Sequence, residues 1–180
     1  EEAKLLNANF VILSPTWTAT QKMIPVFGPV AGKDMSSKVL GLAATDAHNL
    51  GLQVAFFPTL HLPETGDLWW QESKRDFSWW VSWFESYRVF LINYADEAQR
   101  NSASALVLGG DWLLPALPGG KLTDGTPSGV PQDADQRWLN LITEVRAHFT
   151  GILIWSLSYP QQVENPPKFL DQFDAFNVQW

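Results

Sequence analysis

One acidic residue stands where a carboxyl group could take part in bond cleavage. Asp111 closely follows the apolar run 105–108 and lies between two glycines and a tryptophan. Hydrolysis of a glycosidic bond uses two carboxyl groups that flank the scissile bond, one of them protonated as the general acid. Apolar Trp112 and Leu113 would desolvate the Asp111 carboxyl and favour its protonated form. A turn-forming or solvated aspartate is the alternative interpretation.

Aromatic residues form the second group with a chemical meaning, because ten of the 180 residues are tryptophan. Flat aromatic rings stack on the apolar faces of sugars, but tryptophan also fills protein cores. Helical spacing predicts core positions for Trp79, Trp80, Trp83 and Trp138. Places at strand ends or in loops predict ligand-facing positions for Trp17, Trp69, Trp70, Trp112, Trp155, Tyr159 and Trp180.

Several polar residues complete the candidate site. His61 follows the apolar run 53–57 and could hydrogen-bond a sugar hydroxyl, and Gln179 at the end of the chain is a further predicted substrate-binding residue. Glu64, Asp67 and Glu164 are secondary candidate carboxylates. The three histidines are scattered, cysteine is absent and no nucleotide-binding glycine motif occurs, so we predict neither a metal nor a cofactor.

The elements that must position these residues alternate along the chain. Continuous apolar runs predict buried strands over 10–14, 53–57, 105–108, 152–155 and 175–178. Three- and four-residue spacing predicts helices over 36–50, 78–100 and 133–149, and a short helix-like piece covers 2–6. Alternating strands and helices indicate an α/β fold with a parallel sheet, in a single domain spanning residues 1–180.

The lengths of the connections show which end of the sheet carries function. Helix-to-strand links are short, whereas the strand-to-helix links are long and rich in proline and glycine, over 15–35, 58–77, 109–132 and 156–167. These long links leave the carboxyl ends of the strands, where (β/α) barrels and open α/β sheets bind ligands. We therefore expect the binding site there.

Composition excludes some partners. The formal net charge of −7 argues against nucleic acid and anionic membrane surfaces, and no stretch is apolar and long enough to span a bilayer. The absence of cysteine is compatible with export. We expect a secreted or cell-surface protein.

Several segments resemble the barrels of clan A glycoside hydrolases. Residues 7–17 and 51–60 are similar to the second and third strands of these barrels, 83–98 and 138–151 to the following helices, and 173–180 to the sixth strand. The nearest likeness is to glycoside hydrolase family 113, which holds β-mannanase-like barrels. The resemblance implies a TIM barrel with a retaining mechanism, a carbohydrate ligand and Asp111 as the acid/base. It also implies that Trp17, His61, Trp112, Trp155 and Trp180 line the sugar subsites.

The sequence departs from the family at the catalytic pair. The family's fourth strand ends in Gly-Thr-Glu, whereas the matching residues here are Gly109, Gly110 and Asp111. Aspartate is one methylene shorter, which sets the carboxyl back by about 1.5 Å, and a misplacement of about 1 Å can reduce a rate about 100-fold. The family's nucleophile lies on a seventh strand, and this chain matches only strands two to six. The resemblance therefore implies an incomplete barrel with at most half of the catalytic pair.

An incomplete barrel leaves two strand edges unpaired, which favours aggregation. We therefore expect the rest of the barrel, or another chain, at strands 10–14 and 175–178. Two alternatives to a hydrolase stay open. One is a non-catalytic carbohydrate-binding or structural barrel, which the aspartate in place of glutamate favours. The other is a flavodoxin-like domain that binds a small molecule, which strand order would distinguish.

Overall fold

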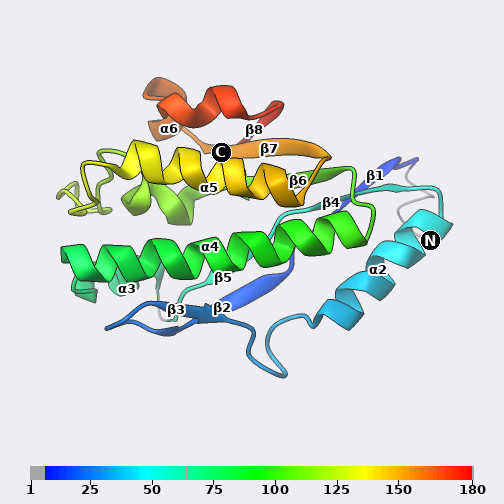
Figure 1. Cartoon of the computed structure of the whole chain (residues 1–180), viewed down its shortest axis with the longest axis horizontal. Helices are drawn as coiled ribbons and strands as arrows, with labels where there is room; N and C mark the ends of the chain where they lie inside the picture. Colours follow the sequence, from blue (N-terminus) through cyan, green and yellow to red (C-terminus); the bar gives the residue numbers. More distant parts are fainter. Residues whose placement is uncertain (1–6, 64, 180) are drawn as a thin grey trace.

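The computed structural model describes residues 7–63 and 65–179. Five parallel strands form the main sheet, in the order β1 (Phe10–Leu13), β4 (Gln53–Phe56), β6 (Ala105–Gly109), β7 (Ile152–Ser158) and β8 (Ala175–Gln179). Strands that follow one another in this series are spatial neighbours, and the sheet curls into part of a barrel (Figure 1). A doubly wound sheet would reverse its order at one point. The incomplete TIM barrel is thus confirmed, and the flavodoxin-like alternative is wrong.

The three predicted long helices are confirmed within a few residues at each end. They are α2 (Ser37–Asn49), α4 (Phe77–Arg100) and α5 (Ala134–His148). Ser36 caps α2 by accepting a hydrogen bond from the Val39 amide, and Gly51 after the helix has a φ of 75°, which favours glycine. The helix-like piece over 2–6 lies outside the described residues.

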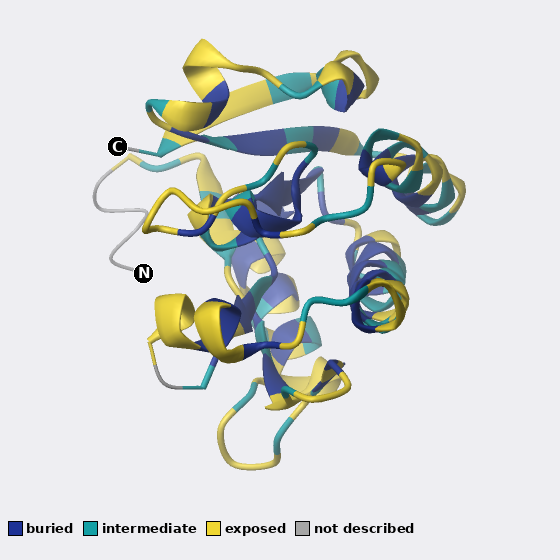
Figure 2. Cartoon of the chain, turned by 90° about the vertical axis from the view of Figure 1, so that its left-hand side faces the viewer, coloured by how far each residue is buried: buried dark blue, intermediate teal, exposed yellow. Residues whose placement is uncertain are grey.

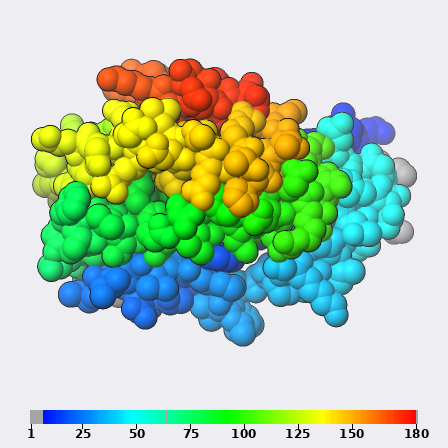
Figure 3. All heavy atoms as spheres, viewed as in Figure 1, coloured from blue at the N-terminus to red at the C-terminus, as the bar shows by residue number. Residues whose placement is uncertain are grey.

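The long loops hold structure that the sequence pattern did not indicate. Strands β2 (Thr16–Gln21), β3 (Val26–Gly28) and β5 (Thr59–His61) form a second, three-stranded sheet. The connections also hold short helices: α3 (Gly66–Glu72), η1 (Asp111–Ala116), α6 (Gln161–Glu164) and η2 (Lys168–Gln172). Figure 3 shows the β2–β3 hairpin, in blue, along the lower edge of the molecule and the segment around η2, in red, along its upper edge.

An aromatic layer fills the space between the main sheet and helices α4 and α5. The predicted core positions are confirmed, because Trp79, Trp80, Trp83 and Trp138 are all buried. The Trp83 ring stacks on Tyr87 with centroids 5.0 Å apart. Figure 2 shows that the buried residues of α4 and α5 face the sheet. Much of the tryptophan content is therefore explained by packing.

The two outer strands of the main sheet expose apolar side chains. Ile12 on β1 is 50% exposed and Phe176 on β8 is 51% exposed. Within residues 7–63 and 65–179, each of these strands pairs on one side only. None of the described helices is long and apolar enough to cross a membrane. The partner expected at these edges stays a prediction.

Candidate functional site

A large cavity opens at the carboxyl ends of β6 and β7, between the loops that follow these strands. Its volume is about 1190 Å³. Figure 2 looks onto this end of the molecule, where α3, α6 and the loop after η1 gather. The predicted site residues that line the cavity are Trp70, Asp111, Trp112 and Tyr159. The secondary candidates Asp67 and Glu164 also line it, whereas Glu64 lies outside the described residues.

Asp111 begins η1, two residues after the end of β6. Its side chain is exposed, and Oδ1 accepts a hydrogen bond of 2.7 Å from the backbone amide of Trp112. Leu113 turns into the core instead of covering the carboxyl. The expected desolvation of Asp111 is therefore wrong, because the short helix directs this side chain outward. Its catalytic role stays a prediction.

The two residues before Asp111 are glycines, and each allows a close contact that a larger residue would block. Gly109 has a φ of 97°, and a Cβ atom there would lie 2.6 Å from the carbonyl oxygen of Ser156. Gly110 has a φ of 117°, and a Cβ atom there would lie 2.9 Å from Nε1 of Trp112. A threonine at position 110, as in the Gly-Thr-Glu of family 113, would meet the indole. The glycine at position 110, where the family has threonine, thus leaves room for the Trp112 indole.

Trp112 is half-buried, and its ring lies edge-on to Tyr87 with centroids 5.7 Å apart. Its carbonyl oxygen accepts a hydrogen bond from Nε1 of Trp70. The Trp112 Nε1 atom is buried and has no partner among the described residues, and the same is true of Oε1 of Gln179. Both atoms lie beside Gly110, 2.9 Å and 3.7 Å from where its Cβ would be. An unused donor and an unused acceptor therefore both lie near Gly110, which follows the end of β6.

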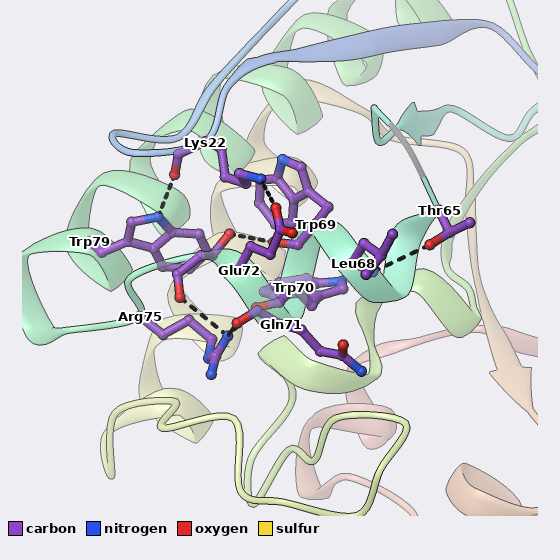
Figure 4. A network of polar contacts seen from close by, with 10 residues as sticks. Lys22, Thr65, Leu68, Trp69, Trp70, Gln71, Glu72, Arg75 and Trp79 are labelled. Carbon is purple, nitrogen blue, oxygen red and sulfur yellow. Dashed lines mark hydrogen bonds and ion pairs between the residues drawn. The ribbon is translucent and has the colours of Figure 1, made fainter.

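Helix α3 forms one wall of the cavity and is held by contacts to two other segments (Figure 4). The guanidinium of Arg75 donates to the carbonyl oxygens of Trp70 and Gln71 at the end of this helix, and to that of Ser128. Lys22 forms an ion pair with Glu72. These contacts tie α3 to the β2–β3 hairpin and to the loop before α5, so the Trp70 ring has a fixed place.

Two predicted ligand-facing tryptophans lie in the core instead. Trp69 is 1% exposed and packs edge-on against Trp70 with centroids 5.0 Å apart. Trp155 is 0% exposed and packs against Trp138 at 5.6 Å. Neither lines the cavity or presents a ring face to it. The prediction that they stack on a ligand is therefore corrected: Trp155 lies within β7, on the side turned toward α5, and Trp69 is on the inner side of α3.

Trp17 and His61 lie away from the main cavity, on the paired strands β2 and β5. His61 is exposed. Trp17 packs edge-on against Phe90 and lines a second cavity of about 350 Å³, formed with residues 29–37 and α4. The two cavities share no lining residue. The structure therefore does not bring these two residues together with Asp111.

Asp34 fixes the loop beside this second cavity. Its carboxylate accepts hydrogen bonds from the hydroxyls of Thr16 and Thr18, at 2.7 Å and 2.9 Å, and from the Val30 amide at 2.8 Å. Burial raises the pKa of Asp34, but these hydrogen bonds and the charge of Lys33 outweigh that effect and hold the pKa below its ordinary value. Asp34 thus acts as an ionised anchor for the loop.

One cavity residue was not indicated by the sequence. Gln162 on α6 is 2% exposed, lines the main cavity and accepts a hydrogen bond from Trp155. No sequence motif indicates that Gln162 lines the cavity, because its position depends on how the chain folds around Trp155. Trp180 lies outside the described residues. Among residues 7–63 and 65–179, no group of three histidine, aspartate or glutamate side chains is placed to hold a metal ion.

Comparisons with known proteins agree on the fold. No protein-family profile and no curated protein matches the sequence. A solved GH113 β-1,4-mannanase is similar, with a TM-score of 0.72 and 20% identity over 98% of this chain and 52% of that chain. A GH113 β-mannanase from Alicyclobacillus acidocaldarius, in complex with ManMIm, gives a TM-score of 0.71 and 21% identity over 97% of this chain and 52% of that chain.

A GH18 chitinase from Pseudoalteromonas aurantia is a more remote neighbour, with a TM-score of 0.54 and 12% identity over 93% of this chain and 59% of that chain. The chain therefore has the fold of a glycoside hydrolase TIM barrel, and the structural likeness to family 113 is confirmed. It spans about half the length of the family 113 structures that it matches.

Proposed function

We propose that this chain binds a polysaccharide or oligosaccharide in the cavity at the carboxyl ends of its barrel strands. The observation that carries the proposal is the composition of the cavity wall. Trp112 and Tyr159 line the cavity from separate loops together with Trp70, which is only 4% exposed, and Asp67, Asp111 and Glu164 line it beside them. Aromatic rings contact the apolar faces of sugars, and carboxylates accept hydrogen bonds from their hydroxyls.

The size of the cavity favours an extended ligand. Its volume of about 1190 Å³ is above the 300–1,000 Å³ of typical small-molecule pockets. Trp112 lines this cavity and carries an unpaired Nε1 donor that a sugar hydroxyl can satisfy, whereas Gln179 does not line the cavity. Because both GH113 neighbours are β-mannanases, β-1,4-linked mannan is the first ligand to test. A polysaccharide ligand also fits a secreted or surface-displayed protein.

Affinity electrophoresis through gels that contain β-1,4-mannan, xylan, a soluble cellulose derivative or a soluble chitin derivative tests the proposal. We expect retardation in at least one gel, strongest with mannan. The Trp112→Ala variant should lose the retardation, whereas Phe77→Ala should keep it, because Phe77 is exposed and does not line the cavity. Unchanged mobility of the wild-type chain in every gel would contradict the proposal.

Hydrolysis is a second candidate function, favoured by the position of Asp111. This carboxylate lies just after β6, lines the cavity and matches the acid/base position that the resemblance implies. A retaining glycosidase places its second carboxyl about 5–5.5 Å from the first. Release of reducing ends from mannan, measured beside the binding assay, separates the candidates. Retardation without turnover means a binding barrel.

A further inference from the structure

We propose that Gln162 donates a hydrogen bond to the ligand in this cavity and that Trp155 orients it for this purpose. The inference rests on the proposed glycan binding and adds a residue that selects among sugars. It also gives Trp155 a role, as a positioning residue, that differs from ring stacking.

The orientation of the Gln162 carboxamide is set by one contact. Nε1 of Trp155 lies 2.8 Å from Oε1 of Gln162. An indole nitrogen can only donate, so the atom that faces it must be the carboxamide oxygen. The carboxamide nitrogen then points elsewhere, and it has no hydrogen-bond partner among the described residues.

The Trp155 side chain is itself rigidly held. It is 0% exposed, and its ring lies edge-on to Phe169 and Phe173, with centroids 5.1 Å and 5.2 Å away, as well as to Trp138. A close-packed ring of this kind cannot turn to follow another partner. The pair therefore acts as a fixed unit that holds the carboxamide NH₂ group in one orientation.

The residue that carries the unused donor lines the main cavity. Gln162 lines this cavity beside Ser158 and Tyr159 and is only 2% exposed. Buried donors without a partner are rare in folded proteins because leaving them unpaired is unfavourable. A hydroxyl or ring oxygen of a bound sugar is an acceptor of the required kind. A neutral donor fixed in direction distinguishes sugars by where their oxygen atoms lie.

Two variants of the whole chain test the assignment, with β-1,4-mannohexaose as the probe and calorimetry as the readout. Gln162→Met keeps the shape but removes the donor, and we expect about threefold to tenfold weaker binding, the usual effect of one neutral hydrogen bond. Trp155→Phe keeps Gln162 but removes the contact that orients it. We expect weaker binding here too, with a smaller loss than for Gln162→Met.

Two controls separate this role from general destabilisation. Gln172→Met alters an exposed glutamine outside the cavity, and Val145→Ala weakens the buried face of α5 without touching the cavity. Neither control should change the affinity. The side-chain amide resonances of Gln162, assigned by their loss in Gln162→Met, should shift when mannohexaose is added to the ¹⁵N-labelled wild-type protein.

The outcomes are distinguishable. If the wild-type protein binds the sugar and Gln162→Met binds it equally well, the inference is wrong while the proposed function stands. The inference is also wrong if the Gln162 amide resonances do not shift when the sugar is added, which is the result expected if only water pairs the donor. An equal loss in Val145→Ala also overturns it. No binding by the wild-type chain to any glycan overturns the proposed function, and the inference falls with it.

Discussion

The Asp111 carboxylate accepts a hydrogen bond of 2.7 Å from the backbone amide of Trp112, the residue whose indole lines the same cavity. This contact directs the carboxylate along the first turn of η1, on the solvent side. Gly110 precedes both residues and leaves room for the indole. The acid and the aromatic ring are thus placed by the same short turn, and a change in either residue should alter what the cavity does with a sugar.

The length of the side chain at position 111 should control turnover. Asp111→Glu adds the methylene by which this sequence differs from the family, so it moves the carboxyl outward by about 1.5 Å. Where a seventh strand supplies the second carboxyl, we expect mannan hydrolysis to rise by about 10-fold to 100-fold in Asp111→Glu, since misplacements of this size change rates by that order. Asp111→Asn should abolish it. The measurement is kcat/KM from reducing-end release, with the mannohexaose Kd as a control that changes little.

If both Asp111→Glu and the wild-type protein bind mannan but release no reducing ends when the second carboxyl is present, the hydrolytic candidate is wrong and the barrel only binds. Equal rates in the wild-type protein and Asp111→Asn would show that another group supplies the proton.

Trp112 should contribute more to binding than aromatic residues outside the cavity. Trp112→Ala removes the ring from the cavity wall but keeps the carbonyl that accepts from Trp70. We expect affinity for mannohexaose to fall about tenfold or more, as for a central aromatic contact. Trp112→Phe keeps a ring but lacks the unpaired N–H, so its loss should be intermediate. Calorimetry measures both, and a wild-type affinity in Trp112→Phe would show that the N–H contributes nothing to binding.

The main sheet and the long helices could be predicted because the spacing of apolar residues in each element follows from which of its faces are buried. The run 105–108 is apolar throughout, as expected for a strand covered on both faces. The smaller sheet was missed because β2 is not a continuous apolar run and β3 and β5 are three residues each. Their pairing depends on contacts between loops far apart in the sequence, which no local pattern reveals.

The same limit explains the errors at the site. The strand predicted to end at Trp155 continues to Ser158, so Trp155 lies in mid-strand, where its side chain points toward α5. Periodicity identifies a strand but not which of its faces meets a ligand when both are apolar. Asp111 and Tyr159 line the cavity as predicted because each comes within two residues of the end of a main-sheet strand. Gln162 could not be found, since only its packing shows the unused amide.

Gly109 should be needed for the fold itself. Gly109→Ala would place a methyl group 2.6 Å from the Ser156 carbonyl oxygen at a φ of 97°. We expect a loss of about 2–4 kcal/mol in the free energy of unfolding, from backbone strain and overpacking together. Gly28→Ala is the matched control, because no atom lies within 4 Å of its added Cβ and its φ is not positive. Urea denaturation measures both, and similar losses in the two variants would contradict the role of Gly109.

Stability should fall in acid through the cap of α4. The Lys74 ammonium beside Asp76 lowers the pKa of that carboxyl to about 2, with help from the Trp79 amide and the Ser78 hydroxyl, both of which donate to it at 2.8 Å. The ordinary pKa is about 3.9, so the folded protein binds this proton less tightly than the unfolded chain. The stabilisation is therefore complete above about pH 4 and is lost as the pH falls toward 2.

Asp76→Asn keeps a capping side chain without the charge, so wild type should be the more stable of the two at pH 6, with the difference disappearing by pH 2. Urea midpoints between pH 2 and pH 6 measure the difference, and a constant gap across that range would show that the Asp76 charge does not stabilise the helix.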